Sequence, residues 1–252
     1  MRRVVTPAVF GVALILAWEG AVNVFDIQQF LLPKPSAIWS ALLEHRTAIR
    51  KGLTVTGGNA VYGLVVGSTL GVVGALLTAR FRLVNETLQP LAAAINATPI
   101  VALATIFNNW FNGSTDEFSR RLVVILVVFF PVFVNVAKGL TQVDATHLTL
   151  MRSYAASEWA ITRRVRIPNA LPFFMGALTL VAPLALIAAI VAEYFGGTQG
   201  SLGQIITQAA GLTRYDRAWA AVLVASVMGL VLFAGALLLE RAVLPYRRET
   251  MR

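Results

Sequence analysis

The chain has 252 residues, of which 57% are hydrophobic and only 13% are charged, and its formal net charge is +9. A soluble domain carries nearer a quarter charged residues, so this composition argues against a soluble enzyme and excludes a disordered chain. It is typical of a polytopic membrane protein, in which Lys and Arg gather on the cytoplasmic side. The absence of cysteine and the presence of only two histidines exclude disulfides, thiolate metal sites and a histidine-rich metal site.

Six segments are free or nearly free of charge, and each is long enough to cross a bilayer as a helix. They cover residues about 7–25, 53–79, 87–112, 120–139, 167–192 and 218–240. An even number of spans puts both termini on one side, and the loops of that side hold the larger share of Lys and Arg. The sequence therefore predicts one all-α transmembrane domain over residues 1–252, with both termini in the cytoplasm.

Between the first two spans, residues 26–52 open with a Pro-rich turn and continue as a predicted amphipathic helix along the outer interface. Its apolar side carries Ile38, Trp39, Leu42 and Leu43, with Glu44, Arg46 and Arg50 elsewhere. The second span has Gly63, Gly67 and Gly71 at intervals of four, which favours close packing against another helix. A role of these glycines in a substrate pathway is the alternative.

Polar and ionisable residues inside the spans are candidates for a translocation pathway, because they are costly in lipid. This predicted set is Asn96, Thr98, Pro99, Asn108 and Glu193. Hydrogen bonds between helices are the alternative use of the amides, and capping or a salt bridge is the alternative for Glu193. Glu19, near the outer end of the first span, is expected at a wet interface.

The chain lacks the glycine-rich loop that would hold ATP. Its three lysines, Lys34, Lys51 and Lys138, follow Pro33, Arg50 and Ala137, so no Gly-Lys-Ser or Gly-Lys-Thr sequence exists. If the protein uses ATP, another chain binds it.

The stretch between the fourth and fifth spans, residues 141–166, is predicted to form two short cytoplasmic helices. The break between them falls at Ala155-Ala156-Ser157, and Ser157 is placed to cap the second helix. Arg163, Arg164 and Arg166 are expected to face water or lipid head groups, and Pro168 is expected to end the element.

This stretch resembles the cytoplasmic loop of ABC importer permeases, whose pattern is Glu-Ala-Ala, three residues, Gly, nine residues, Ile, one residue and Leu-Pro. When the pattern is anchored on Ile167-Pro168, its Gly falls on Ala155 and its triplet on Thr149-Leu150-Met151. Three further segments resemble the nitrate, sulfonate and taurine branch of the family. They are Leu32-Pro33-Lys34-Pro35-Ser36, Ala97–Ala102 with Trp110-Phe111, and Ala192-Glu193 with the glycines that follow.

The resemblance implies a type I ABC importer permease fold, in the cytoplasmic (inner) membrane, with cytoplasmic coupling helices that engage a separate ATPase. The coupling residues it implies are Thr149, Leu150, Met151, Ala155, Ala156, Ser157, Glu158, Trp159 and Pro168. Two ATPase subunits would bind ATP and Mg, this chain would hold no cofactor, and no nucleic acid would be involved. A second permease, identical or not, a substrate-binding protein outside and membrane lipid are the other implied partners.

The implied activity is ATP-driven import, by alternating access, of a nitrate-, sulfonate- or taurine-like anion or a small heterocycle. A secondary transporter or channel without an ATPase is the alternative, and it predicts an inverted repeat or an ion relay. A membrane-embedded enzyme is a third class, which needs a reactive constellation. The sequence contains none of these features, and a secondary transporter would leave residues 138–168 without a task.

Overall fold

The computed structural model describes residues 2–81, 86–88, 90, 91, 94, 97–111, 117–196 and 199–244. Every regular element in this part of the chain is helical, which confirms the predicted all-α class. The elements are α1 (Arg2–Val24), α2 (Pro35–Glu44), α3 (Arg46–Arg80), α5 (Ile100–Trp110), α6 (Phe118–Thr141), α7 (Ala145–Ser153), α8 (Glu158–Ile161), the π-helical turn η1 (Thr162–Arg166), α9 (Ile167–Gly196), α10 (Leu202–Gly211) and α11 (Tyr215–Val243).

Four helical runs in the described residues are long and apolar enough to cross a membrane. They are α3, α6, the run Glu158–Gly196 and α11. The apolar part of α1 (Val9–Val24) and α5 are shorter, and part of the predicted third span, 87–112, lies outside the described residues. A polytopic helical membrane protein is confirmed, whereas the count of six spans stays a prediction.

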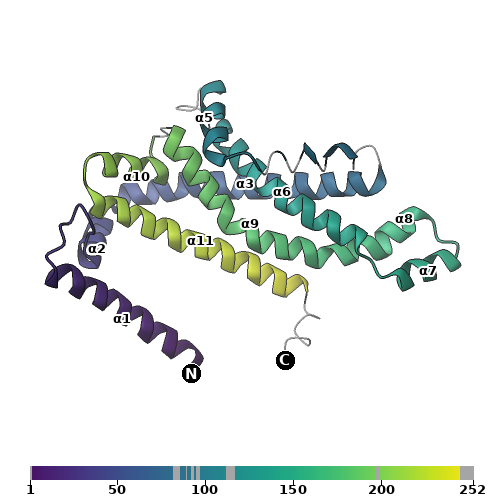
Figure 1. Cartoon of the computed structure of the whole chain (residues 1–252), viewed down its shortest axis with the longest axis horizontal. Coiled ribbons are helices and arrows are strands. Elements are labelled where there is room, and N and C mark those ends of the chain that lie inside the picture. Colours follow the sequence, from purple (N-terminus) through teal and green to yellow (C-terminus); the bar gives the residue numbers. More distant parts are fainter. Residues whose placement is uncertain are drawn as a thin grey trace.

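The core forms where α6 packs between α3 and α9 (Figure 1). Val124, Val128 and Val132 of α6 lie four residues apart and are fully buried. They face the glycines of α3: a Cβ on Gly67 would lie 2.7 Å from the carbonyl oxygen of Ile125 and 2.9 Å from Cβ of Val128. The predicted close helix packing at this face is confirmed, because only a glycine lets the backbones approach so closely.

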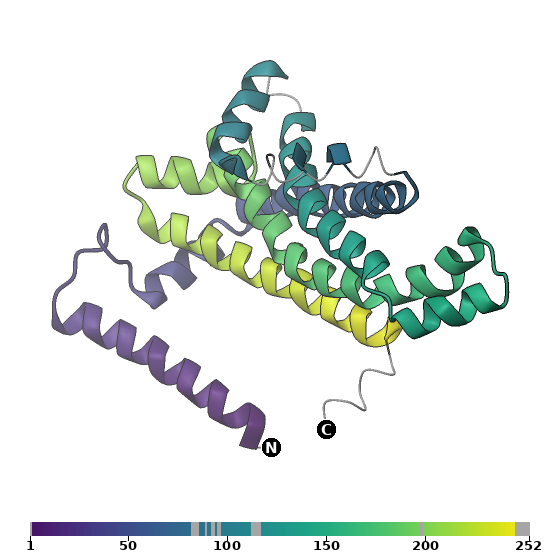
Figure 2. The same cartoon turned by 45° about the vertical axis from the view of Figure 1, so that its right-hand side comes forward.

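Short helices lie at both ends of the molecule. Figures 1 and 2 show α2 and α10 at one end and α7 and α8 at the other, with α9 running between them. We call these the α10 end and the α7–α8 end. Helix α1 joins the α10 end through α2, because the backbone N–H and the hydroxyl of Ser36 donate to the Glu19 carboxylate at 3.0 and 2.7 Å. This hydrogen-bonded pair lies at the surface of the chain, and the wet position of Glu19 stays a prediction.

The amphipathic helix predicted in 26–52 is shorter than the pattern suggested. Helix α2 ends at Glu44, and Arg46 and Arg50 belong to α3. It is held by burial of Ile38 and Ala41, in a cluster shared with α10 and α11, while Trp39 and Leu43 remain exposed. The face of α2 that packs on the bundle is therefore the one that carries Ile38 and Ala41.

The prediction that Pro168 ends the cytoplasmic element is wrong. The helix continues from Glu158 through η1 and α9 to Gly196 without interruption. In η1 the turn widens, and the N–H of Ile167 donates to the carbonyl oxygen of Thr162, five residues back. Pro168 has no N–H to donate, so beside a widened turn it omits one backbone bond without breaking the helix.

Candidate functional site

The first part of the candidate site is residues 144–166, which we call the elbow. Its first helix, α7, begins at Asp144, whose Oδ1 accepts a hydrogen bond from the N–H of Thr146 at 2.8 Å. This bond lowers the pKa of the Asp144 carboxyl below its ordinary value, since it stabilises the charged form. A charged cap at the helix N-terminus satisfies one of its free N–H groups and fixes where α7 starts.

The bend of the elbow is closed by backbone bonds at Ala155. Ala155 has a φ of +52°, in the left-handed region, and its N–H donates to the carbonyl oxygen of Arg152 at 2.9 Å. The N–H of Ala156 donates to the carbonyl oxygen of Met151 at 3.1 Å. This pair of bonds is the Schellman ending of a helix, in which glycine is the preferred left-handed residue. The predicted break at 155–157 is confirmed, and Ala155 stands where the family pattern has its glycine.

The second helix of the elbow starts at Ser157, as the sequence predicts. The hydroxyl oxygen of Ser157 accepts from the N–H of Ala160 at 3.3 Å and caps α8. At the far end of η1, Arg163 and Arg164 are exposed as expected. Arg166 differs, because it is half-buried and its Nη2 donates to Glu158 at 3.5 Å, which holds α8 against η1.

Large apolar side chains protrude from the elbow into solvent. Leu150 is 52% exposed, Trp159 is 68% exposed and Tyr154 is 77% exposed. Of the nine predicted coupling residues, Met151 and Ala156 are half-buried and the rest are exposed: Thr149, Leu150, Ala155, Ser157, Glu158, Trp159 and Pro168. Tyr154 was missed by the motif, although an aromatic residue beside a helix break is a visible signal. Exposed apolar groups on a preformed bend are typical of a surface that a partner covers.

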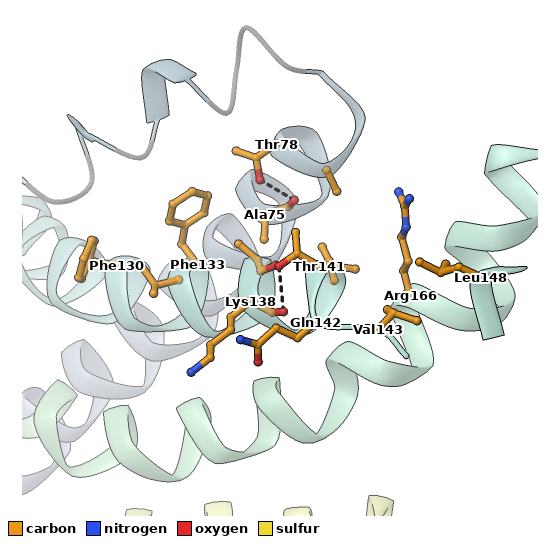
Figure 3. A pocket seen from close by; sticks show the side chains of 14 residues that line it. Ala75, Thr78, Phe130, Phe133, Lys138, Thr141, Gln142, Val143, Leu148 and Arg166 are labelled. Carbon is orange, nitrogen blue, oxygen red and sulfur yellow. Dashed lines mark hydrogen bonds between the residues drawn. The ribbon is translucent and has the colours of Figure 1, made fainter. Parts of the chain in front are cut away.

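A cleft of about 740 Å³ separates the elbow from the bundle (Figure 3). Figure 3 shows Thr78 and Ala75 of α3 on one side, Phe133 and Thr141 of α6 below them, and Arg166 of η1 across the opening. Nδ2 of Asn169 donates to the carbonyl oxygens of Gly139 and Gln142 at 2.7 and 2.9 Å. Asn169 thus ties the start of α9 to the end of α6, a role the sequence motif did not indicate.

The predicted pathway residues of the third span have different surroundings in the structure. Asn108 joins three helices, because its Nδ2 donates to the carbonyl oxygen of Ala192 at 3.2 Å and its Oδ1 accepts from Ser119 at 2.9 Å. Thr98 is exposed and donates to its own segment at Ala94, and Pro99 precedes the first turn of α5. Asn96 lies outside the described residues.

The Glu193 side chain is fully buried at the α10 end. Its Oε2 accepts from the hydroxyl of Thr56 at 2.7 Å and from the N–H of Gly203 at 3.3 Å, and its Oε1 accepts from Nδ2 of Asn59 at 3.5 Å. Arg120 is also fully buried. This geometry joins α3, α9 and α10 through one carboxylate, as the predicted capping alternative requires.

Comparison with known proteins places this helical arrangement in a family. The family model described as binding-protein-dependent transport system inner membrane component matches residues 63–245. A formylaminopyrimidine transport permease of Halalkalibacterium halodurans is 30% identical over 246 residues, with 96% of each chain covered. A putative aliphatic sulfonates transport permease of Bacillus subtilis is 26% identical, with 99% of this chain and 88% of that protein covered.

A solved structure described as an amino acid ABC transporter shares the fold. Its TM-score is 0.68 at 16% identity, with 80% of this chain and 96% of that chain covered. The expected type I importer permease fold is therefore confirmed, together with the resemblance to the sulfonate and taurine branch. The chain belongs to the family of binding-protein-dependent transport system inner membrane components and is an ABC importer permease.

Proposed function

We propose that this permease imports a small solute by alternating access, driven by a separate ATPase that binds the elbow. The observation that carries the proposal is the exposed apolar surface of Leu150, Tyr154 and Trp159 on a bend fixed by three caps. A preorganised apolar surface loses little conformational entropy when a partner covers it. The long helix that starts at Glu158 then carries the motion of the partner into the membrane.

The remaining partners follow from this role. Two ATPase subunits bind ATP and Mg, because this chain has no nucleotide loop of its own. Both termini and the elbow lie in the cytoplasm, and a substrate-binding protein docks at the α10 end outside. The permease acts with a second permease, either its own copy or a non-identical homologue that carries the complete triplet.

We base the proposed solute class on the transport activities for which the relatives are named. A planar heterocycle is our first choice, because the 30% identical relative is named for formylaminopyrimidine transport. An organic anion is the second, because the 26% identical relative is named for aliphatic sulfonates. Ligand screening of the co-purified binding protein with both classes decides between them.

The test is purification of the complex from the native host in mild detergent, with each co-purifying chain identified by mass. The Trp159→Ala variant is expected to weaken ATPase retention by about tenfold or more, since an interface Trp is commonly worth about 2 kcal/mol. Trp39→Ala is the matched control, because Trp39 is 58% exposed on α2 at the other end of the molecule. Recovery of the chain without an ATPase, while other known complexes survive, would refute the proposal and favour a secondary transporter.

A further inference from the structure

The long helix of this permease joins its two ends. The run Glu158–Gly196 has 39 residues, and at 1.5 Å per residue it spans about 58 Å. It begins inside the elbow and reaches the α10 end, where Glu193 lies one turn before its last residue (Figures 1 and 2). A displacement of the elbow can reach α10 directly through this helix if α10 is fastened to its end.

The Glu193 carboxylate provides such a fastening. Its Oε2 holds the N–H of Gly203 in the first turn of α10 and, on the other side, the hydroxyl of Thr56 in α3. The Thr56 hydroxyl oxygen also accepts from the N–H of Leu202 at 3.0 Å. Glu193 and Thr56 together therefore accept hydrogen bonds from two successive N–H groups at the start of α10. The first N–H groups of any helix lack partners within the helix and need such acceptors.

Helix α10 lies very close to α9 and to α3 at this point. A Cβ on Gly203 would lie 2.6 Å from Cβ of Glu193 and 2.8 Å from the carbonyl oxygen of Ile190. A Cβ on Gly52 of α3 would lie 3.0 Å from the side chain of Leu202. Backbones this close interlock, so α10 cannot shift along α9 without breaking the bonds to Glu193.

Breaking those bonds is costly because the groups are buried. Glu193 and Thr56 are fully buried, and an uncompensated charge or N–H in such a place carries a large desolvation penalty. The apolar side chains of Leu202, Ile205 and Ala209 also pack α10 on the bundle.

We propose that Glu193 is a positioning residue that locks α10 to the end of the long helix, so that motion of the elbow is transmitted to the α10 end. The proposal rests on the proposed function, since it takes the elbow as the place where an ATPase acts. It assigns Glu193 to the transmission of motion and not to contact with the solute.

The test measures the two ends separately. The chain has no cysteine, so a single cysteine introduced at Ser153 of α7 or at Gln208 of α10, both exposed, takes a fluorophore at one defined place. Each labelled permease is assembled with its co-purified ATPase, and the change in emission on trapping with ATP and vanadate is recorded. The unmodified chain is expected to respond at both positions.

Glu193→Gln keeps the size of the side chain but removes its charge and one acceptor oxygen. It is expected to keep the response at Ser153 and to lose the response at Gln208. Thr56→Val removes the second holder of α10 and is expected to act likewise, whereas Thr56→Ser keeps the hydroxyl and restores the response. Glu44→Gln is the control, because Glu44 is exposed at the end of α2, where its carboxylate lies 3.8 Å from Nε2 of His45.

A response at Gln208 that persists in both Glu193→Gln and Thr56→Val would overturn the inference and leave the proposed function standing. If Glu193→Gln fails to fold, the Thr56 pair decides by the same comparison. Absence of any response at Ser153 in the unmodified assembly would overturn the proposed function, and this inference with it.

Discussion

Replacing Ala155 with glycine is predicted to stabilise the elbow. Ala155 has a φ of +52°, and a side chain in the left-handed region costs about 1–2 kcal/mol through the contact of its Cβ with the backbone. Glycine removes that cost but adds about 0.5–1 kcal/mol of conformational entropy to the open chain. The net gain is about 0.5–1 kcal/mol, which corresponds to an open population roughly two- to five-fold smaller.

Amide hydrogen exchange can measure this gain in stability at the bend itself. The N–H of Ala156 bonds to the carbonyl oxygen of Met151 only while the bend is closed, so its exchange rate reports opening of the bend. Ala155→Gly is expected to slow this exchange by about two- to five-fold. Ala156→Gly is the control, because Ala156 is not left-handed and glycine there adds only entropy, which speeds exchange. Faster exchange in Ala155→Gly, or equal effects of the two variants, would refute the assignment of strain to Ala155.

Three further predictions concern the packing of α3 and the caps of the elbow. Gly67→Ala should lower the melting temperature in detergent, through about 1–3 kcal/mol of overpacking against α6, whereas Gly58→Ala, with no atom within 4 Å of its new Cβ, should be neutral or gain up to about 1 kcal/mol. Ser157→Ala should cost about 1 kcal/mol of local stability at α8 and speed exchange of the Ala160 N–H, while Ser157→Asp, which also caps, should not. The Asp144 cap should hold above the ordinary pKa of 3.8 and be lost as the pH falls through the lowered pKa of the folded chain. The amide shift of Thr146 should follow this titration, and a midpoint at or above 3.8 would contradict it.

The parts of the elbow that the sequence predicts correctly are set by local rules. The break at 155–157 and the Ser157 cap depend on residues within one helical turn of each other, and a capping serine acts the same way in any protein. The glycine face of α3 is also local, because a spacing of four residues puts side chains on one face before any partner is known. In each case the structural feature depends on residues that are close in the sequence, so the sequence pattern predicts it.

The features that the sequence does not predict depend on contacts between distant segments. The sequence could not indicate the partners of Glu193, because its hydrogen bond comes from Thr56, 137 residues away. Ile38 and Ala41 of α2 are buried against the bundle while Trp39 and Leu43 are exposed, and the apolar pattern of 26–52 could not reveal which side packs. The family pattern specifies no residue type at Asn169. Its contact with the end of α6 becomes visible only in the folded chain.

The wrong prediction at Pro168 bears most directly on function. A proline inside a helix commonly costs about 3 kcal/mol, which is why a helix end was expected there. The widened turn at Thr162–Arg166 relieves this conflict, because its carbonyl and N–H pairing has already shifted by one residue where the proline arrives. Had the helix ended, α8 and Trp159 would belong to a separate element from α9. Because the helix continues, the same residues are joined to Glu193 by one uninterrupted helix, Glu158–Gly196, in which the widened turn is followed by Pro172 and Pro183.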